Sequence, residues 1–317
     1  MPFQDRDQPP APKPYTLIDL PDANVVTRSQ PVGHAKIDGS YLTGRVRFDV
    51  EALSSVHVSS GLLRLTEDRR QPLVKALVRV DGVPVVPGSS FKGCVRSVVE
   101  AISRSCVRAT RSREVPSKLQ GCNRKESVCV ACQLFGAQDL QALVRFSDMR
   151  QTAGDVEVAT VPQLFRPRPQ EGPYVFQRSV RGRKFYMHGA RQAQGDGPIE
   201  VCATGSSFAG QIDFTNLSRA QLGLLLVALG QHPNYPLFLK LGGAKPACYG
   251  SVRVDNVAVD VVSVEQRYLQ WDAGPDSQAD IAGLINEAQQ LLLQTQLAAV
   301  VETLKWPNDR DCPSGTY

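Results

Sequence analysis

Two helical patterns, each lying between strand patterns, constrain the fold of this chain most. The first lies in SSFKGCVRSVVEAISRSC, where an N-cap serine precedes apolar residues spaced three and four apart. The second begins after Asn216 or Ser218 and runs through AQLGLLLVALG. Strand patterns flank both helices, and YLTGRVRFDV (41–50) alternates apolar and polar residues as a half-buried strand does. This order predicts an α+β fold with a split βαβ or ferredoxin-like core, in which two helices back one antiparallel sheet.

Such a core is small for 317 residues, so we expect large loop insertions and terminal segments around it. The expected organisation is a flexible N-terminal arm (1–20), one elaborated domain (21–275) and a C-terminal helix and tail (276–317). Within the domain, the polar segment 104–136 is an insertion, and the Gly-, Pro- and Arg-rich segment 165–200 is a projecting hairpin. The tail sequence SQADIAGLINEAQQLLLQTQLAAVVETLK predicts one long amphipathic helix that docks on this domain or on a neighbouring subunit.

No segment reaches the ~18 consecutive apolar residues of a membrane span, and the first residues lack the order of a signal peptide. We therefore expect a cytoplasmic protein without a membrane partner. In that reducing compartment, cysteines favour metal ligation or unpaired core thiols over disulfides. Four of them stand alone in the sequence and are predicted to be core or surface thiols, namely Cys94, Cys202, Cys248 and Cys312.

The other four cysteines, Cys106, Cys122, Cys129 and Cys132, form the pattern C-x15-C-x6-C-x2-C. The close CVAC pair can grip one ion while the distant pair completes a tetrahedron, as in structural zinc sites. Because a polar loop of this length has no core of its own, a zinc ion would supply folding free energy. Four protein ligands leave no open position, so we assign this metal no catalytic role. Unligated thiols and a redox pair are the alternatives.

Positive charge is concentrated in two parts of the chain. Between Lys92 and Lys125 there are nine Lys/Arg against two Glu, and between Arg166 and Lys184 there are six against one Glu. Such local positive fields concentrate polyanions, and phosphate contacts of Lys and Arg supply most sequence-independent affinity for nucleic acids. A solvated charged surface is the alternative.

The segment PGSSFKG and the turn after it bring Ser89, Ser90, Lys92 and Arg96 to the start of the first helix. Main-chain amides at a helix N-terminus, assisted by nearby cations, bind phosphate oxygens. The alternative is an ordinary N-cap and turn with exposed basic residues.

A second candidate is the glycine-rich loop GGAKPACYGSV (242–252), between two predicted strands. Gly242 and Gly243 permit close approach of a ligand to the backbone, Lys245 adds a positive charge, and Tyr249 could stack on a base. The loop does not match a Walker pattern, so nucleotide hydrolysis is not indicated. A simple hairpin turn is the alternative.

A third candidate is VRGRKFYMHG, in which cations alternate with aromatic residues. Cations neutralise phosphates and aromatic faces stack on unpaired bases, which is how single strands are held without sequence readout. Core aromatics beside surface charges are the alternative. The residues proposed here for RNA contact are Arg181, Arg183, Lys184 and Tyr186.

The joint order of PGSSFKGCVRS, CVACQLFG, RGRKFYMHG and GGAKPACYGSV resembles the repeat-associated mysterious protein (RAMP) superfamily. More narrowly, it is similar to backbone subunits of type III CRISPR effector complexes, especially the type III-D and III-E lineages, over about Tyr41 to Val262. The resemblance implies an RRM-like core that binds guide crRNA and pairs it with target RNA, a hairpin thumb that kinks the guide, and companion effector subunits. The positions that match guide-contacting residues are Ser89, Ser90, Lys92, Arg96, Gly242, Gly243 and Lys245.

Active members of this family cut target RNA with a loop aspartate and a divalent ion. The corresponding segment here is LLRLTEDRRQ, where Asp68 is the first candidate and Glu67 the second. A carboxylate there could position Mg²⁺ or orient the 2′-hydroxyl that attacks the adjacent phosphate. The sequence departs from the family, because the acid is expected closer to the proline and without the intervening RRQ. The alternatives are a charged loop in a non-cutting guide scaffold, a metal-independent endoribonuclease that processes the guide precursor, and a zinc-containing RNA-binding protein unrelated to CRISPR.

Overall fold

The computed structural model describes residues 13–67, 72–108, 115–164, 174–176, 179–263, 265, 269 and 277–313. Its helices are α1 (Gly88–Ile102), α2 (Val130–Phe135), α3 (Arg219–Ala228), α5 (Ile281–Ala288) and α6 (Gln294–Thr303). Its strands are β1 (Tyr15–Asp19), β2 (Leu42–Ala52), β3 (Ser59–Leu65), β4 (Leu73–Leu77), β5 (Arg79–Val80), β6 (Val83–Val86), β7 (Val144–Phe146), β8 (Met149–Ala153), β9 (Val156–Val161), β10 (Val175–Phe176), β11 (Ser179–Val180), β12 (Gly182–Tyr186), β13 (Gly197–Cys202), β14 (Ser207–Leu217), β15 (Leu239–Lys240), β16 (Ser251–Val261) and β17 (Ser277–Gln278).

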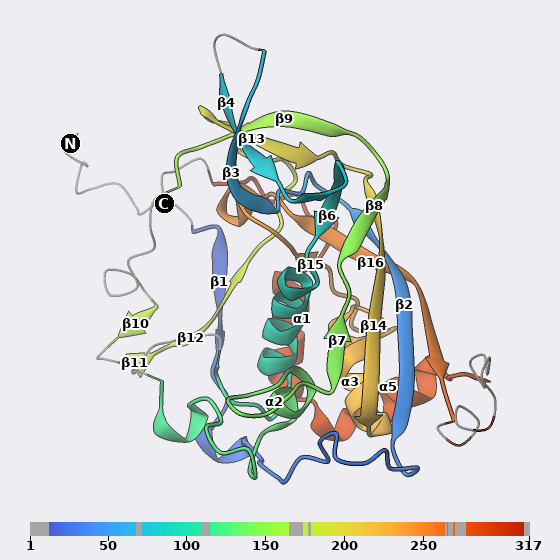
Figure 1. Ribbon diagram of the computed structural model, residues 1–317. Coiled ribbons are helices and arrows are strands. Elements are labelled where there is room, and N and C mark those ends of the chain that lie inside the picture. Colours follow the sequence, from blue (N-terminus) through green and yellow to red (C-terminus); the bar gives the residue numbers. More distant parts are fainter. Residues whose placement is uncertain are drawn as a thin grey trace.

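A large curved sheet forms the centre of the molecule (Figure 1). Its strand order is β15-β16-β2-β14-β8-β6-β5, with β7 also paired to β14 and β17 to β16, and every pairing is antiparallel. Helix α1 follows β6, and α3 follows β14 directly along the chain. The predicted α+β class, with an antiparallel sheet backed by helices, is confirmed.

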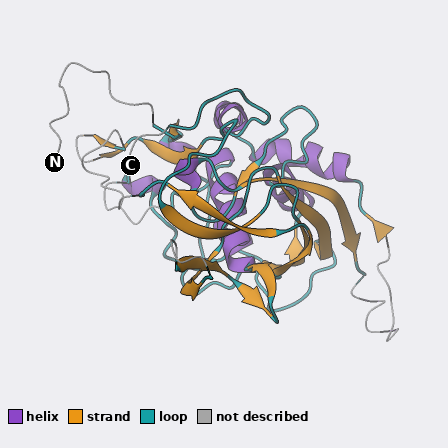
Figure 2. Cartoon of the chain, turned by 90° about the horizontal axis from the view of Figure 1, so that it is seen from above, coloured by secondary structure: helices purple, strands orange, loops and turns teal. Residues whose placement is uncertain are grey.

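The alternation of side chains explains which face of this sheet the helices cover. In β2, Val46, Phe48 and Val50 are buried while Arg45 and Arg47 are exposed. Because successive side chains of a strand point to opposite faces, one face carries the core and the other faces solvent. Phe91 of α1 stacks on Phe48, and Figure 2 shows helices gathered along one side of the curved strands. The hydrophobic core therefore lies between the sheet and α1, α3, α5 and α6.

A second, four-stranded sheet with the order β3-β4-β13-β9 lies at one end of the molecule (Figure 1). The loop that joins β3 to β4 contains Glu67. Separately, β1 pairs with β12 as an antiparallel ribbon. The last residues of the segment expected to be a flexible arm are thus a strand.

The tail departs from its prediction. The expected single helix is broken into α5, a 3-10 turn over Gln289–Leu291 and α6. The break arises because Leu292 forms a β-bridge with Ser103, and the Leu293 amide donates to the Ile102 carbonyl at the end of α1. Both helices pack on the domain's own core, α5 against α3 and α6 against α1. In the ranges described above, no helix is long and apolar enough to cross a bilayer.

Candidate functional site

The four clustered cysteines lie together in the fold, and all four are buried. Their sulfur atoms lie within 4.8 Å of one another, and Cys106 Sγ is 3.6 Å from Cys132 Sγ and 3.5 Å from Cys129 Sγ. Tetrahedral zinc with Zn–S bonds of about 2.3 Å spaces its sulfurs about 3.8 Å apart. The cluster could therefore hold a metal ion such as zinc.

Hydrogen bonds to the sulfurs also fit metal-bound thiolates. The Cys106 amide donates to Cys129 Sγ (3.4 Å), and the Cys129 amide donates to Cys122 Sγ (3.3 Å). Within the cluster, hydrogen bonding from Cys106 lowers the pKa of the Cys122 thiol and lowers that of Cys129 to about 7, while the thiols packed around Cys106 and Cys132 raise the pKa of these two. Donors aimed at sulfur favour the thiolate, which is the form that binds zinc.

Two of the arginines predicted to contact RNA belong to this centre instead. Arg96 donates to Glu100 (2.8 Å), to the Gly136 carbonyl (3.1 Å) and to Cys132 Sγ (3.6 Å). Arg183 is 7% exposed and donates to Glu100 (3.0 Å) and to the Cys106 carbonyl (2.9 Å). Because both guanidinium groups are engaged inside the chain, we leave Arg96 and Arg183 out of the RNA-contacting set.

Helix α1 begins at Gly88, with Pro87 as the N-cap residue, so the predicted serine N-cap is wrong. The Gly88 amide donates to the Asp148 carboxylate (2.7 Å), which takes the place of a serine cap. A side chain at Gly88 would collide with the Phe146 carbonyl, which explains why glycine stands at this close approach. Ser89 is exposed and Ser90 is half-buried in the first turn. Burial, with a smaller effect of Arg96, lowers the pKa of Lys92 on the same turn.

The glycine-rich loop begins beside α1. Cys94 of α1 lies 3.3 Å from the Lys240 carbonyl, which directly precedes the loop. Gly242 has φ +79° and lies against the His57 carbonyl, to which the Gly243 amide donates at 2.7 Å. The half-buried Lys245 follows in a 3-10 turn (Lys245–Ala247). The fold therefore brings the second turn of α1 against β15, the strand that leads into the glycine-rich loop, although the two are far apart in sequence.

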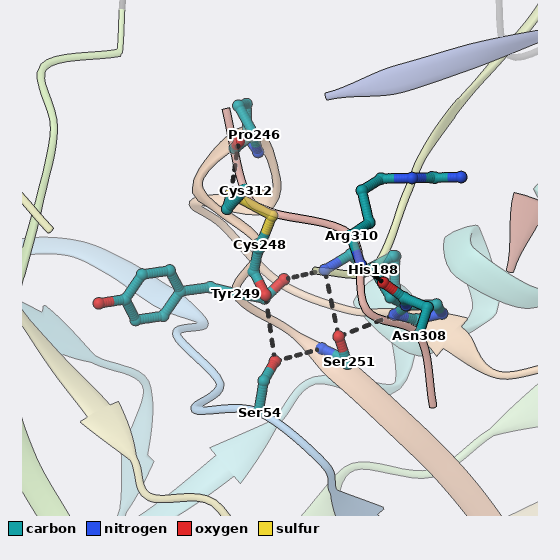
Figure 3. Close-up of a disulfide and its surroundings, with 10 residues drawn as sticks. Ser54, His188, Pro246, Cys248, Tyr249, Ser251, Asn308, Arg310 and Cys312 are labelled. Carbon is teal, nitrogen blue, oxygen red and sulfur yellow. Dashed lines mark hydrogen bonds between the residues drawn. A yellow bond between two sulfur atoms is a disulfide. The ribbon is translucent and has the colours of Figure 1, made fainter. Parts of the chain in front are cut away.

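A buried polar network supports this loop (Figure 3). The Lys240 ammonium donates to the Tyr249 carbonyl (2.9 Å) and to Ser251 Oγ (3.2 Å), and Ser251 Oγ is 2.7 Å from His188 Nδ1. Burial lowers the pKa of Lys240 to about 7 and that of His188 to about 3. The network joins the two ends of the loop to residue 188, which follows β12.

The loop is also bonded covalently to the tail, because Cys248 and Cys312 form a disulfide (Figure 3). The prediction of two isolated thiols is wrong at these positions, since the fold brings residues 64 apart in sequence into contact. Cys94 and Cys202 are free cysteines, as expected. The Tyr249 ring is 3% exposed and its hydroxyl donates to the Thr160 carbonyl (3.3 Å), so it cannot stack on a base as predicted.

The third motif lies on the β1–β12 ribbon. Lys184 Nζ lies 4.1 Å from the Tyr15 ring centroid and 4.9 Å from that of Tyr186, and all three side chains are half-buried. Burial lowers the pKa of Lys184 to about 8. Arg181, directly before β12, is exposed. This ribbon keeps part of the expected aromatic and cationic surface accessible.

The two candidate catalytic acids lie in the segment that joins β3 to β4. Asp68 lies outside the described residues, and Glu67 is exposed where the chain leaves β3. Residues 165–173 and 177–178 of the expected hairpin (165–200) also lie outside them; its described part contains the β10–β11 pair, β12 and most of β13.

Glu100 and Lys240 were not singled out from the sequence. Glu100 is 1% exposed and Lys240 is 6% exposed, and each is bonded to main-chain groups as well as to side chains. One signal for Glu100 was present, because Arg96 and Glu100 are four residues apart on a helix and can pair there.

These features describe an α+β protein with a candidate metal centre, a glycine-rich loop beside a helix and a basic aromatic ribbon. A family model described as the RAMP superfamily matches residues 49–253. The chain therefore belongs to the RAMP superfamily, as its motif order indicates.

Among solved structures, the chain is similar to one described as "Cryo-EM structure of the Type III-B Cmr-beta bound to cognate target RNA". The sequence identity is 12% and the TM-score is 0.38, and the match covers 69% of this chain and 61% of that chain. The chain thus matches less than two thirds of that relative's length. No match was found among curated proteins.

Proposed function

We propose that this chain is a crRNA-binding backbone subunit of a type III-like CRISPR effector that acts in the cytoplasm on guide and target RNA together with other subunits. The observation that carries this proposal is that Cys94, in the second turn of α1, contacts Lys240 of β15, two residues before the glycine-rich loop, and that helix and loop both fall within the RAMP match. A guide of any sequence must fit, so contacts to the sugar-phosphate backbone are the ones such a subunit needs.

The proposed contacts follow from exposure and chemistry. At the α1 start, Ser89 and Ser90 offer hydroxyl groups and Lys92 a positive charge, while the Asp148 carboxylate already occupies the first amide. In the glycine-rich loop, Lys245 offers a positive charge, while Gly242 and Gly243 hold the loop against the His57 carbonyl, to which the Gly243 amide donates. On the ribbon, Arg181, Lys184 and Tyr186 supply two cations and an aromatic face.

We further propose that the centre of the large sheet is an RRM-like core. The order β16-β2-β14-β8, with α1 between β2 and β8 and α3 between β14 and β16, supports it. In this interpretation the segment around the four cysteines is a zinc-stabilised insertion. Cys106, Cys122, Cys129 and Cys132 would hold Zn²⁺, which would supply folding free energy to a segment whose own apolar cluster is small, with Val107, Val115 and Leu119 packed against Val180. Elemental analysis should find about one zinc per chain.

The proposed cleavage activity rests on Asp68, with Glu67 as the second candidate. Both follow β3, in the segment that joins it to β4 and that the family resemblance assigns to the catalytic loop. With Mg²⁺ and guide-paired target RNA, the wild-type chain should cut the target and Asp68→Ala should not. Equal cutting by both proteins would show that Asp68 is not the catalytic acid. No cutting by either would indicate that the chain is a non-cutting guide scaffold. Cutting of repeat RNA without metal would indicate that it processes the guide precursor.

RNA binding itself is tested by fluorescence anisotropy with a single-stranded guide over a range of salt concentrations. The double variant Lys92→Gln/Lys245→Gln should bind more weakly, and its salt slope should fall by about 1.4, since each lost phosphate contact on a single strand contributes about 0.7. The control is Arg219→Gln, which removes an exposed arginine that pairs with Glu287. Unchanged affinity and slope in the double variant would contradict the proposed contacts.

A further inference from the structure

Glu100 lies at the junction between the candidate metal centre and the β1–β12 ribbon. Its side chain is fully buried on α1, and three groups donate to its carboxylate: Arg96 Nε at 2.8 Å, Arg183 at 3.0 Å and the Arg108 amide at 3.2 Å. A buried carboxylate persists only when its charge is paired and its oxygens are hydrogen-bonded. Each of these three donors comes from a different segment of the chain.

The first consequence concerns Cys106. Arg183 donates to the Cys106 carbonyl while Glu100 accepts from the amide of Arg108, two residues further on. The short segment 106–108 is therefore held by Glu100 and by the arginine that Glu100 pairs with. The segment has no helix or strand of its own, and its other backbone support is Val107, which forms a β-bridge with Gln120 and donates to the Leu119 carbonyl (2.7 Å).

The second consequence concerns Cys132. Arg96 donates from one nitrogen to Glu100, from a second to the Gly136 carbonyl at the end of α2, and from a third to Cys132 Sγ. It thus fixes the end of the short helix that carries Cys132 and places a positive charge beside that sulfur. A guanidinium offers several donors in a fixed planar fork, which a lysine ammonium does not.

The third consequence concerns the ribbon. Arg183 belongs to β12, is paired in register with Ile18 of β1, and directly precedes Lys184. Its Nε has no partner among the described residues, so the hydrogen bonds of its two terminal nitrogens, to Glu100 and to the Cys106 carbonyl, hold the guanidinium. The Arg183 side chain thereby joins the ribbon to a candidate metal ligand.

The geometry points to Glu100, Arg96 and Arg183 as positioning residues that fix two of the four metal-binding cysteines and couple metal occupancy to the order of the β1–β12 ribbon. The coupling between metal and ribbon follows from these contacts alone. Its effect on RNA affinity, through Lys184 and Tyr186, rests on the proposed function.

The first test measures zinc affinity of the full chain by competition with a chromogenic chelator of known affinity. Arg183→Lys and Arg96→Lys keep the positive charge but lose the fork, and Glu100→Gln keeps the shape but loses the charge. Each should weaken zinc binding about 10- to 100-fold, as loss of groups that orient metal ligands does. The control is Arg253→Gln, an arginine that forms exposed ion pairs with Glu51 and Asp255, which should bind zinc as the wild type does. If Glu100→Gln fails to fold, the two lysine variants decide the question.

The second test follows hydrogen exchange of the amides of residues 182–186 in zinc-loaded and chelator-stripped protein, without RNA. Removing zinc from the wild type should speed exchange in the ribbon, and Arg183→Lys should show fast exchange even with zinc bound. The inference would be overturned if the lysine variants bound zinc as tightly as the wild type, or if the ribbon amides exchanged at the same rate with and without zinc. If the ribbon responds to zinc but guide affinity does not, the coupling stands and the proposed role of the ribbon in RNA binding fails.

Discussion

Gly242 shows how a single position in the candidate RNA site is fixed by backbone geometry. Its φ of +79° disfavours any residue with a Cβ, and a Cβ there would also collide with the His57 carbonyl. Gly242→Ala should therefore lose more than the ~1–2 kcal/mol that a left-handed conformation alone costs. The measurement is urea unfolding, together with guide affinity of the folded fraction.

A matched control separates the two causes. Gly205 has φ +86° but nothing within 4 Å of the place where a Cβ would stand. Gly205→Ala should cost only the conformational part and leave guide affinity unchanged. If the two alanine variants lose equal stability, the close approach at His57 is not a constraint.

Lys240 should give the stability a recognisable pH dependence. Its folded pKa of about 7 lies below its ordinary value of 10.5, mainly because the ammonium is buried and secondarily because of Lys245. Between these two values the unfolded chain binds more protons than the folded one, so unfolding free energy rises with pH, by at most about 1.4 kcal/mol per pH unit.

Lys240→Met removes the titrating group while keeping an unbranched side chain. The wild type should gain stability relative to this variant as pH rises from 7 to 9, measured by urea unfolding. The neighbouring His188 has a pKa of about 3 and does not titrate in this range. If the difference in unfolding free energy between wild type and variant stays constant with pH, the pKa of Lys240 is not lowered in the folded protein.

Residue identities predicted which side chains would cluster at a metal site better than they predicted which charged side chains are exposed. The spacing of Cys106, Cys122, Cys129 and Cys132 was enough to predict that they cluster, because a metal site needs a fixed set of ligands close together. Arg183 was assigned to RNA because a charge in a basic motif suggests a surface. Only the fold shows that it is paired with Glu100 inside the molecule.

At the scale of elements, the helices whose ends are set by local sequence were predicted correctly, whereas the break in the tail helix, which a distant contact sets, was not. The apolar spacing correctly indicated α1, and Ser218 forms a capping box with Gln221 at the start of α3. The tail has no Pro or Gly at its break, which is imposed by the β-bridge from Leu292 to Ser103. No local signal marks such a break, because its cause lies almost 200 residues away.

The disulfide makes the tail an element whose attachment can be tested. Closing a loop between Cys248 and Cys312, 64 residues apart, restricts the unfolded chain by up to about 4 kcal/mol in the loop-entropy model. Cys312→Ser should lower the unfolding free energy by up to that amount, measured without reductant. A phosphine reductant should weaken the wild type similarly and leave Cys312→Ser unchanged. Equal stability of wild type and variant under oxidising conditions would contradict the tether.

At the scale of the whole molecule, the fold class followed from element order but several long-range pairings did not. The antiparallel sheet backed by helices was predictable, because strand and helix patterns alternate in an order that few topologies accommodate. The β1–β12 ribbon joins Tyr15 to Tyr186. The second sheet pairs β4 with β13 in parallel. Neither pairing has a local signature, because nothing in one strand's sequence names its distant partner.

The solvent face of the large sheet gives a prediction about where RNA does not bind. Along β2, β14 and β16 the outward side chains alternate with the buried ones, and none of them is aromatic. Arg45 pairs with Asp213 and Arg47 with Asp260. At the other end of this face, Asp49, Glu51 and Asp255 line a shallow pocket together with Arg253, which pairs with Glu51 and Asp255. A surface whose cations are paired with carboxylates and that lacks stacking groups is poorly suited to single-stranded RNA.

The double variant Arg45→Gln/Arg47→Gln tests this directly. Loss of the partly exposed Arg45–Asp213 pair should cost about 0–1 kcal/mol of stability, and loss of Arg47 should cost more because its partner Asp260 is buried, while guide affinity should change less than twofold. In the same anisotropy titration, Lys92→Gln/Lys245→Gln should lose affinity and salt dependence. The opposite ranking of the two double variants would move the RNA from the α1 start and the glycine-rich loop to the open face of the sheet. That result would indicate that the sheet surface, and not the loop backbone, binds the nucleotides, as in RRM domains.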